Sequence, residues 1–278
     1  MTRPLRVAVV GARRRRQGTG EFMARDLARA GCEVAAVVGT TPASAREAAD
    51  HLRAAYGVDP APVTDLAQVV GEVDAVAIAS PSEHHLPALE LALEARRHVL
   101  CEKPLWWAPD LDLGPAGAAR VAEVTGRLAA RAAEAGRVVW VNAQWPFTLP
   151  AFDALHPGAR AGPPRTFVMH MGPTARDPVA MVQDSASHFL SMLEALCGPG
   201  RLERVRVDLV GDLRAPEVEP GPDAPGEARP GLDLACAWVH AGGETDARFV
   251  LRRWPRPPRP AGYALDGRAA ERRIRPAD

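Results

Sequence analysis

Lysine is almost absent from this 278-residue sequence: Lys103 is the only one among 34 cationic residues, and the rest are arginine. Asparagine also occurs once, at Asn142, and isoleucine twice. All three have AT-rich codons, so their shortage indicates a GC-rich genome in which arginine replaces lysine wherever a solvated charge suffices. It cannot replace a compact ammonium that contacts a substrate, because guanidinium is larger and stays protonated. Lys103 is therefore a candidate functional residue, the alternative being that it persists by drift.

Three further absences narrow the classes of protein to which this sequence can belong. The formal net charge is zero, so the overall charge does not favour binding to nucleic acid or to an anionic membrane. No apolar run approaches the ~20 residues of a membrane-spanning helix, and residues 1–16 lack the pattern of a secretory signal. The four cysteines form no CxxC pair, which is typical of reduced thiols and argues against a zinc site. We expect a cytoplasmic protein that binds a small molecule and no metal.

Apolar runs and helical patterns alternate through the first half of the chain. The apolar runs are continuous, as in strands buried on both faces, and the segments between them have the spacing of amphipathic helices. This alternation indicates right-handed βαβ units and a parallel, doubly wound sheet of the Rossmann type, which we place at residues 1–145. The expected strands are 5–11, 32–39, 73–80, 97–102 and 137–144, and the expected helices are 20–31, 44–57, 83–95 and 118–136.

The pattern changes after residue 145. Successive strands with a single helix indicate a second, α+β domain at residues 146–278, with a mostly antiparallel open sheet. We expect this domain to bind substrate and to form a homo-oligomer through its sheet. The segment 214–231 is rich in Pro, Gly and acidic residues and is interpreted as a loop. The expected strands are 165–172, 202–211, 232–241 and 244–254, and the expected helix is 184–198.

A glycine-rich turn follows the first strand, in "VVGARRRRQGTGEF". Such a turn lets backbone amides and a helix N-terminus approach a pyrophosphate. Gly11 and Gly20 are farther apart than in the usual GxGxxG spacing, and four consecutive arginines lie between them. Alone, this pattern is equally compatible with a solvated basic loop.

Two later segments carry a resemblance to a known family. The string "DAVAIASPSEHH", followed by a helix and then "RRHVLCEKPL", closely resembles the nicotinamide-dependent oxidoreductases of the Gfo/Idh/MocA family, which includes glucose–fructose oxidoreductase and inositol dehydrogenase. The resemblance covers most of residues 5–145, and it implies that this chain has a shortened C-terminal domain. The positions that match the family motifs are Ser80, Pro81, His84 or His85, Glu102, Lys103 and Pro104.

The resemblance also implies a catalytic pair in the second domain. The family carries an Asp and a His four residues apart at the opening of a helix, and Asp184 and His188 match this pattern. That spacing places both side chains on one helical face. The alternative is that Asp184 is an N-cap and His188 an ordinary partly buried histidine. Ala186 and Ser191 depart from the glycine and aspartate common in the family, which leaves the substrate contacts open.

By this resemblance the chain is an NAD(P)-dependent oxidoreductase that acts on a sugar, a cyclitol or another small carbonyl or imine compound. Lys103, Asp184 and His188 would be catalytic, since a histidine that titrates near neutral pH suits proton transfer in both directions. Two alternatives stay open: a catalytically silent dinucleotide-binding protein, and an NAD-dependent glycosidase of the same family. The expected cofactor-binding residues are Gly11, Arg13, Gly18, Thr19, Gly20, Thr40, Thr41, Ser80, Pro81, His84, Glu102, Lys103 and Asn142, although Asn142 could equally form a turn.

The end of the second strand predicts which cofactor binds. An enzyme that selects NAD usually carries an Asp or Glu about 20 residues beyond the glycine turn, where it binds the ribose 2′-hydroxyl. Here the strand ends in Gly39, Thr40 and Thr41, without a carboxylate. Arginines 13–16 and Arg46 lie nearby in the sequence, and arginine suits phosphate oxygens. We therefore predict NADP over NAD. The alternative is that the arginines face solvent and both cofactors are accepted.

Overall fold

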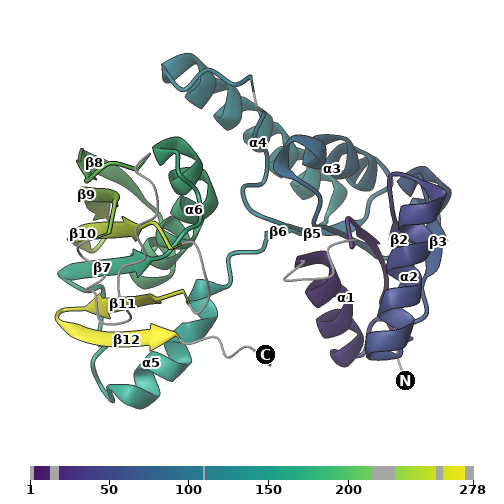
Figure 1. Cartoon of the computed structure of the whole chain (residues 1–278), viewed down its shortest axis with the longest axis horizontal. Coiled ribbons are helices and arrows are strands. Elements are labelled where there is room, and N and C mark those ends of the chain that lie inside the picture. Colours follow the sequence, from purple (N-terminus) through teal and green to yellow (C-terminus); the bar gives the residue numbers. More distant parts are fainter. Residues whose placement is uncertain (1–2, 13–18, 109, 214–228, 255–258, 273–278) are drawn as a thin grey trace. The chain divides into compact units, whose positions relative to one another are not determined.

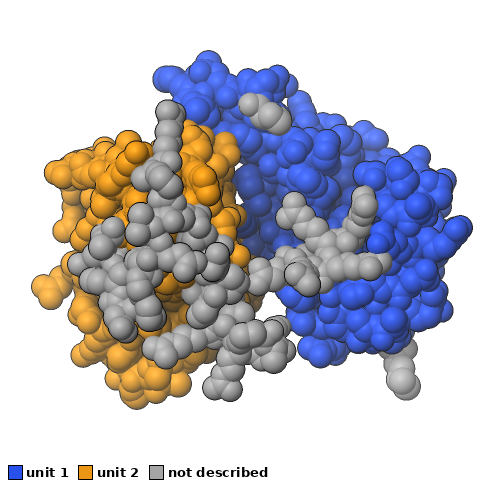
Figure 2. Space-filling view, in the orientation of Figure 1, with its two compact units in different colours: residues 1–142 blue, residues 143–278 orange. Residues whose placement is uncertain are grey.

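The computed structural model describes residues 3–12, 19–108, 110–213, 229–254 and 259–272. The chain forms two compact units, Met1–Asn142 and Ala143–Asp278 (Figure 1, Figure 2). The sequence-based boundary lay after residue 145. In the structure the boundary between the units lies after Asn142, because Trp145 is buried in the hydrophobic core of the second unit.

The first unit contains a parallel sheet whose described strands have the order β3-β2-β1-β4-β5-β6. The order reverses between β1 and β4, and ligands of such sheets bind at the carboxyl ends of the strands beside that point. The predicted Rossmann-type sheet is confirmed. Its strands are β1 (Arg6–Val10), β2 (Glu33–Val38), β3 (Ala61–Val63), β4 (Ala75–Ile78), β5 (His98–Cys101) and β6 (Val139–Val141).

Helices cover both faces of this sheet (Figure 1). Side chains alternate along a strand, so Val7 and Val9 pack with residues of α1 and α2, while Ala8 packs in the core that contains residues of α3 and α4. Burial on both faces is the reason for the continuous apolar runs in the sequence. The helices are α1 (Thr19–Arg29), α2 (Pro42–Tyr56), α3 (His85–Glu94) and α4 (Pro115–Ala135).

The second unit has a mixed sheet, with described strands in the order β12-β11-β7-β10-β9-β8. Only the β7–β10 pair is parallel among these, so the predicted α+β unit with a mostly antiparallel sheet is confirmed. Its helices are α5 (Leu149–Leu155) and α6 (Pro178–Cys197). Its strands are β7 (Thr166–Met171), β8 (Gly200–Val210), β9 (Gly231–His240), β10 (Gly243–Arg252), β11 (Ala261–Leu265) and β12 (Arg268–Arg272).

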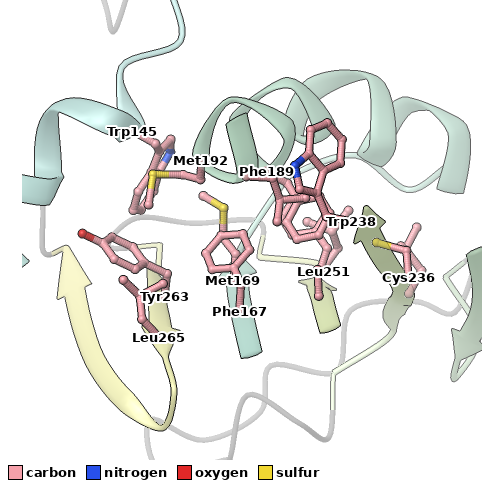
Figure 3. Packing of buried hydrophobic residues seen from close by; sticks show 14 of the residues in the cluster. Trp145, Phe167, Met169, Phe189, Met192, Cys236, Trp238, Leu251, Tyr263 and Leu265 are labelled. Carbon is pink, nitrogen blue, oxygen red and sulfur yellow. The ribbon is translucent and has the colours of Figure 1, made fainter. Parts of the chain in front are cut away.

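Helix α6 packs its apolar side on one face of this sheet (Figure 3). Phe189 of α6 stacks on Phe167 and Phe249, with ring centroids 5.4 and 4.8 Å apart. On the opposite face, Val168 and Ala235 both lie beside Arg248, and all three side chains are exposed. In the part of the chain that the structure describes, none of the helices has the length and apolar character needed to cross a membrane.

Candidate functional site

The turn after β1 passes very close to the end of β4. Gly11 has a φ of +90°, and a Cβ built on it would lie 2.7 Å from the backbone nitrogen of Ser80. A Cβ on Gly20, in the first turn of α1, would lie 2.8 Å from the carbonyl oxygen of Gly11. Both positions therefore require glycine, which brings the N-terminus of α1 to the strand ends. Thr19 is the first residue of α1, whereas Arg13 and Gly18 lie outside the described residues.

Ser80 and Pro81 follow β4 at the same edge of the sheet. The Ser80 hydroxyl is buried and has no hydrogen-bond partner among the described residues. A buried polar group without a partner is costly and calls for a ligand or a water molecule. With the close approach at Gly11, this hydroxyl fits a dinucleotide bound across the reversal point between β1 and β4. Pro81 is exposed.

Glu102 and Lys103 follow β5, and Asn142 follows β6. The Asn142 side-chain amide donates to Glu102 Oε1, and its backbone N–H donates to the Cys101 carbonyl at 2.7 Å. Burial raises the pKa of the Glu102 carboxyl, and the hydrogen bond from Asn142 and the charge of Lys103 oppose that rise. The single asparagine thus joins the ends of β5 and β6 and orients the carboxylate beside Lys103.

The two histidines of the "SEHH" segment have different environments. His84 ends a one-turn helix (Ser82–His84) and is exposed. His85 begins α3 and is 1% exposed. Its Nε2 lies 2.7 Å from the Ser80 carbonyl oxygen, and its Nδ1 lies 3.1 Å from that of Pro104. His85 is therefore the histidine that contacts the loops after β4 and β5. Both histidines match the family motif, but only His84 was included among the expected cofactor-binding residues.

The threonines after β2 also differ from each other. Thr41 is the N-cap of α2: its hydroxyl accepts from the Ser44 backbone N–H at 3.1 Å, and Ser44 Oγ accepts from the Thr41 N–H at 3.0 Å. Such a reciprocal cap fixes the start of the helix. Thr40 and Arg46 are exposed. No carboxylate stands between the end of β2 and the start of α2.

Asp184 and His188 lie within α6 rather than at its start. The helix begins at Pro178, and its N-cap is Asp177, whose side chain accepts from the Ala180 N–H at 2.9 Å. The interpretation of Asp184 as the N-cap is therefore wrong. Asp184 is exposed, whereas His188 is 6% exposed and its ring lies edge-on to Trp145, with centroids 6.5 Å apart.

The structure therefore gathers the expected residues into two groups, each within its own unit. The first lies at the carboxyl ends of the parallel strands, and the second is the Asp184–His188 pair on α6. Across the described ranges, no three His, Cys, Asp or Glu side chains are grouped so that they could hold a metal ion. The first group consists of Gly11, Thr19, Gly20, Ser80, Glu102, Lys103 and Asn142.

Solved structures resemble the chain in fold. UDP-N-acetylglucosamine 3-dehydrogenase GnnA from Acidithiobacillus ferrooxidans has a TM-score of 0.66 at 22% identity, over 98% of this chain and 77% of that one. GenD2 from gentamicin A biosynthesis, in complex with NAD, has a TM-score of 0.67 at 20% identity, over 98% and 73%. Apo scyllo-inositol dehydrogenase from Lactobacillus casei has a TM-score of 0.66 at 19% identity, over 98% and 76%.

Two inositol dehydrogenases match part of the chain in sequence. Inositol 2-dehydrogenase 1 of Paenarthrobacter aurescens (strain TC1) is 41% identical over 105 residues, which are 38% of this chain and 30% of that protein. Inositol 2-dehydrogenase of Arthrobacter sp. (strain FB24) is 39% identical over 112 residues, 40% and 31% of the two chains. The match thus spans under a third of each relative's length.

The sequence profile of one family matches residues 5–143, half of the 278-residue chain. The profile describes an oxidoreductase family with an NAD-binding Rossmann fold, in agreement with the strand order and the glycine turn of the first unit. The chain belongs to the Gfo/Idh/MocA family of oxidoreductases.

Proposed function

We propose that this protein is an NAD(P)-dependent oxidoreductase that transfers a hydride between nicotinamide and a small sugar or cyclitol, or a related carbonyl or imine compound. The observation that carries the proposal is the position of the chain's only lysine. Lys103 lies two residues after β5, next to Glu102, at the edge of the sheet where Gly11 and Ser80 would bind the dinucleotide. The inositol dehydrogenases among the relatives support a cyclitol as substrate.

The chain's own residues would bind, orient and move a proton. Gly11, Gly20 and Ser80 would hold the dinucleotide, which supplies or accepts the hydride when bound. Lys103 would donate a hydrogen bond to the reacting oxygen and polarise it. His188 would give a proton to that oxygen in reduction and take it in oxidation. Asp184 would orient His188 or accept from a neighbouring substrate hydroxyl.

A turnover screen tests this function. The purified chain would be incubated with NADP and with NAD against inositols, aldoses, UDP-N-acetylglucosamine and cyclic imines, while absorbance of the reduced nicotinamide is followed. We expect stoichiometric cofactor reduction or oxidation with at least one class. Cofactor binding without any turnover would support the silent dinucleotide-binding protein. Hydrolysis of a glycoside with no net change in the cofactor would support the glycosidase.

The finer choice of cofactor is part of the proposal: we expect NADP to bind more tightly than NAD. A carboxylate at the end of β2 would repel a 2′-phosphate, and this chain has the exposed Thr40 there instead. The N-terminus of α2 follows immediately, and it favours an anion. Arg46 is exposed about one turn after the start of α2 and can form a charge-assisted hydrogen bond to phosphate.

Replacement of Arg46 measures this preference. Arg46→Ala should raise the Kd for NADPH about tenfold, which corresponds to about 1.4 kcal/mol, and leave the Kd for NADH within about twofold. The loss should shrink at high salt, because the interaction is electrostatic. Arg53→Ala is the matched control, since Arg53 is an exposed arginine on the same helix that already pairs with Asp50 and Asp59. Tighter binding of NADH by the wild type would refute the preference.

The second unit's sheet is the expected homo-oligomer interface. Val168, Ala235 and Arg248 form an exposed row on the face opposite to α6. Val168→Arg should place like charges in that row and lower the native mass measured by light scattering to that of a monomer. Leu209→Arg, on the edge strand β8, is an exposed apolar control that should leave the mass unchanged. If Val168→Arg left the native mass unchanged, the interface between subunits would lie elsewhere on the protein.

We also propose that the enzyme is cytoplasmic. Its four cysteines are free thiols, as is typical of a reducing compartment: Cys32, Cys101, Cys197 and Cys236.

A further inference from the structure

His85 connects two loops that the proposed function requires to stay together. It is the first residue of α3, and its side chain is almost completely buried. On one side Nε2 lies 2.7 Å from the carbonyl oxygen of Ser80. On the other side Nδ1 lies 3.1 Å from the carbonyl oxygen of Pro104 and 3.2 Å from that of Leu105. The Cys101 sulfur lies 3.4 Å from the same nitrogen.

The backbone groups on both sides of the ring are acceptors. A carbonyl oxygen cannot donate, so any hydrogen bond between the ring and one of these loops is donated by the ring nitrogen that faces that loop. A buried carbonyl that loses its hydrogen-bond partner is destabilised, because water cannot replace that partner. The buried ring thus lies between the loop after β4 and the loop after β5, with one nitrogen against the backbone of each.

These contacts reach the two functional groups of the first unit. The carbonyl of Pro104 belongs to the residue that directly follows Lys103. At the other end of the ring, Ser80 approaches the Gly11 turn so closely that no Cβ fits between them. The loop that carries Lys103 is therefore connected through one side chain to the turn that forms the dinucleotide site.

We propose that His85 is a positioning residue: it fixes the Lys103 ammonium relative to the dinucleotide site by holding the Pro104 and Leu105 carbonyls against Ser80. This inference rests on the proposed catalytic role of Lys103. His85 itself would touch neither substrate nor cofactor. Its loss should therefore reduce the rate of the chemical step and leave binding of the dinucleotide nearly unchanged.

Two amide variants separate the two ends of the ring. In His85→Asn the side-chain amide nitrogen takes the place of Nδ1, and in His85→Gln it takes that of Nε2, so each variant keeps one end of the bridge. We expect each to lower kcat about 10- to 100-fold, the range for a displacement of about 1 Å at a reacting group. The Kd for NADPH should stay within about threefold. His156→Asn is the matched control, because it removes a histidine contact to the Ala269 carbonyl in the second unit. A folded His85→Asn or His85→Gln with wild-type kcat overturns the inference.

A double-mutant cycle tests whether His85 acts through Lys103. In a Lys103→Ala background, His85→Asn should lower the remaining rate less than about threefold, since the group that it positions is gone. A full 10- to 100-fold loss in that background would show that His85 acts independently of Lys103. Failure of the proposed function looks different: Lys103→Ala itself would then turn over like the wild type.

The single lysine also gives a measurement that needs no substrate. Reductive methylation with ¹³C-formaldehyde labels only Lys103 and the N-terminal amine, and the Lys103→Arg variant assigns the signal. We expect the dimethylamino resonance of Lys103 to be narrow in the wild type and in His156→Asn. In His85→Asn and His85→Gln it should shift and broaden, because the loop samples more positions. An unchanged resonance in the folded variants contradicts the positioning role.

Discussion

The Lys103→Arg variant should fold and bind NADPH like the wild type, yet turn over at least about 100-fold more slowly, the usual effect of removing a positioned polarising or proton-transfer group. The charge is retained, so a general electrostatic role would survive the change. What is lost is a compact donor. The guanidinium is bulkier and planar and spreads its charge over several nitrogens, so it cannot take the ammonium's place against one substrate oxygen. The space beside Lys103 already contains the half-buried Glu102.

The measurement is kcat and KM with the substrate found in the screen, together with the Kd for NADPH and the thermal midpoint. Arg120→Lys is the reverse control: Arg120 is exposed on α4 and pairs with Glu123 across one turn, so the swap should change kcat by less than about twofold. If Lys103→Arg retained activity within about threefold of the wild type, Lys103 would have persisted by drift and would not be a catalytic group.

The first unit was predictable because its strands are buried on both faces. Continuous runs such as Arg6–Val10 and Ala75–Ile78 read as strands in the sequence and form strands in the structure. The exception is β3, Ala61–Val63, which has two exposed residues and a proline and therefore lacks an apolar signal. A strand that joins the edge of a sheet through backbone hydrogen bonds alone has only a weak hydrophobic pattern in its sequence.

The second unit shows where local signals were present and overlooked. The hairpin of β11 and β12 turns at Asp266 and Gly267, both with positive φ, and an Asp-Gly pair is a strong hairpin signal. Helix α6 begins at Asp177 and Pro178, a cap followed by proline at the first helical position. The apolar residues that follow, Val179 to Met181, have no clear helical spacing, so the start was placed later.

Within the site, sequence reasoning located the strand ends but could not assign every side chain. Gly11 and Ser80 were expected near a dinucleotide, and the structure places their backbones in contact distance. The sequence does not distinguish the adjacent His84 and His85. The first turn of α3 turns His85 toward the protein interior and leaves His84 exposed. Thr41 was expected to contact the cofactor, and the structure adds that its hydroxyl caps α2.

The Asp184–His188 pair should behave as one catalytic unit. His188→Ala should lower kcat at least about 100-fold, since it removes the proposed general acid or base, and Asp184→Ala should lower it less. Asp184 is exposed and does not cap the helix, so we expect α6 to stay folded in Asp184→Ala, which a thermal melt would check. The nearby Asp177→Ala provides the contrast. It removes the actual N-cap and should lower stability by about 1 kcal/mol without lowering the kcat of the folded protein.

The decisive result is the double variant Asp184→Ala/His188→Ala. If Asp184 serves by orienting His188 or by favouring its protonated form, it has nothing to act on once His188 is absent, so the double variant should be no slower than His188→Ala alone. Residues four apart on a helix lie close enough for such coupling. If the two losses instead multiply, the carboxylate has a separate task, and the remaining assignment is a hydrogen bond to a substrate hydroxyl. That case has its own signature, because Asp184→Ala would then raise KM for a hydroxylated substrate but not for an analogue that lacks the hydroxyl.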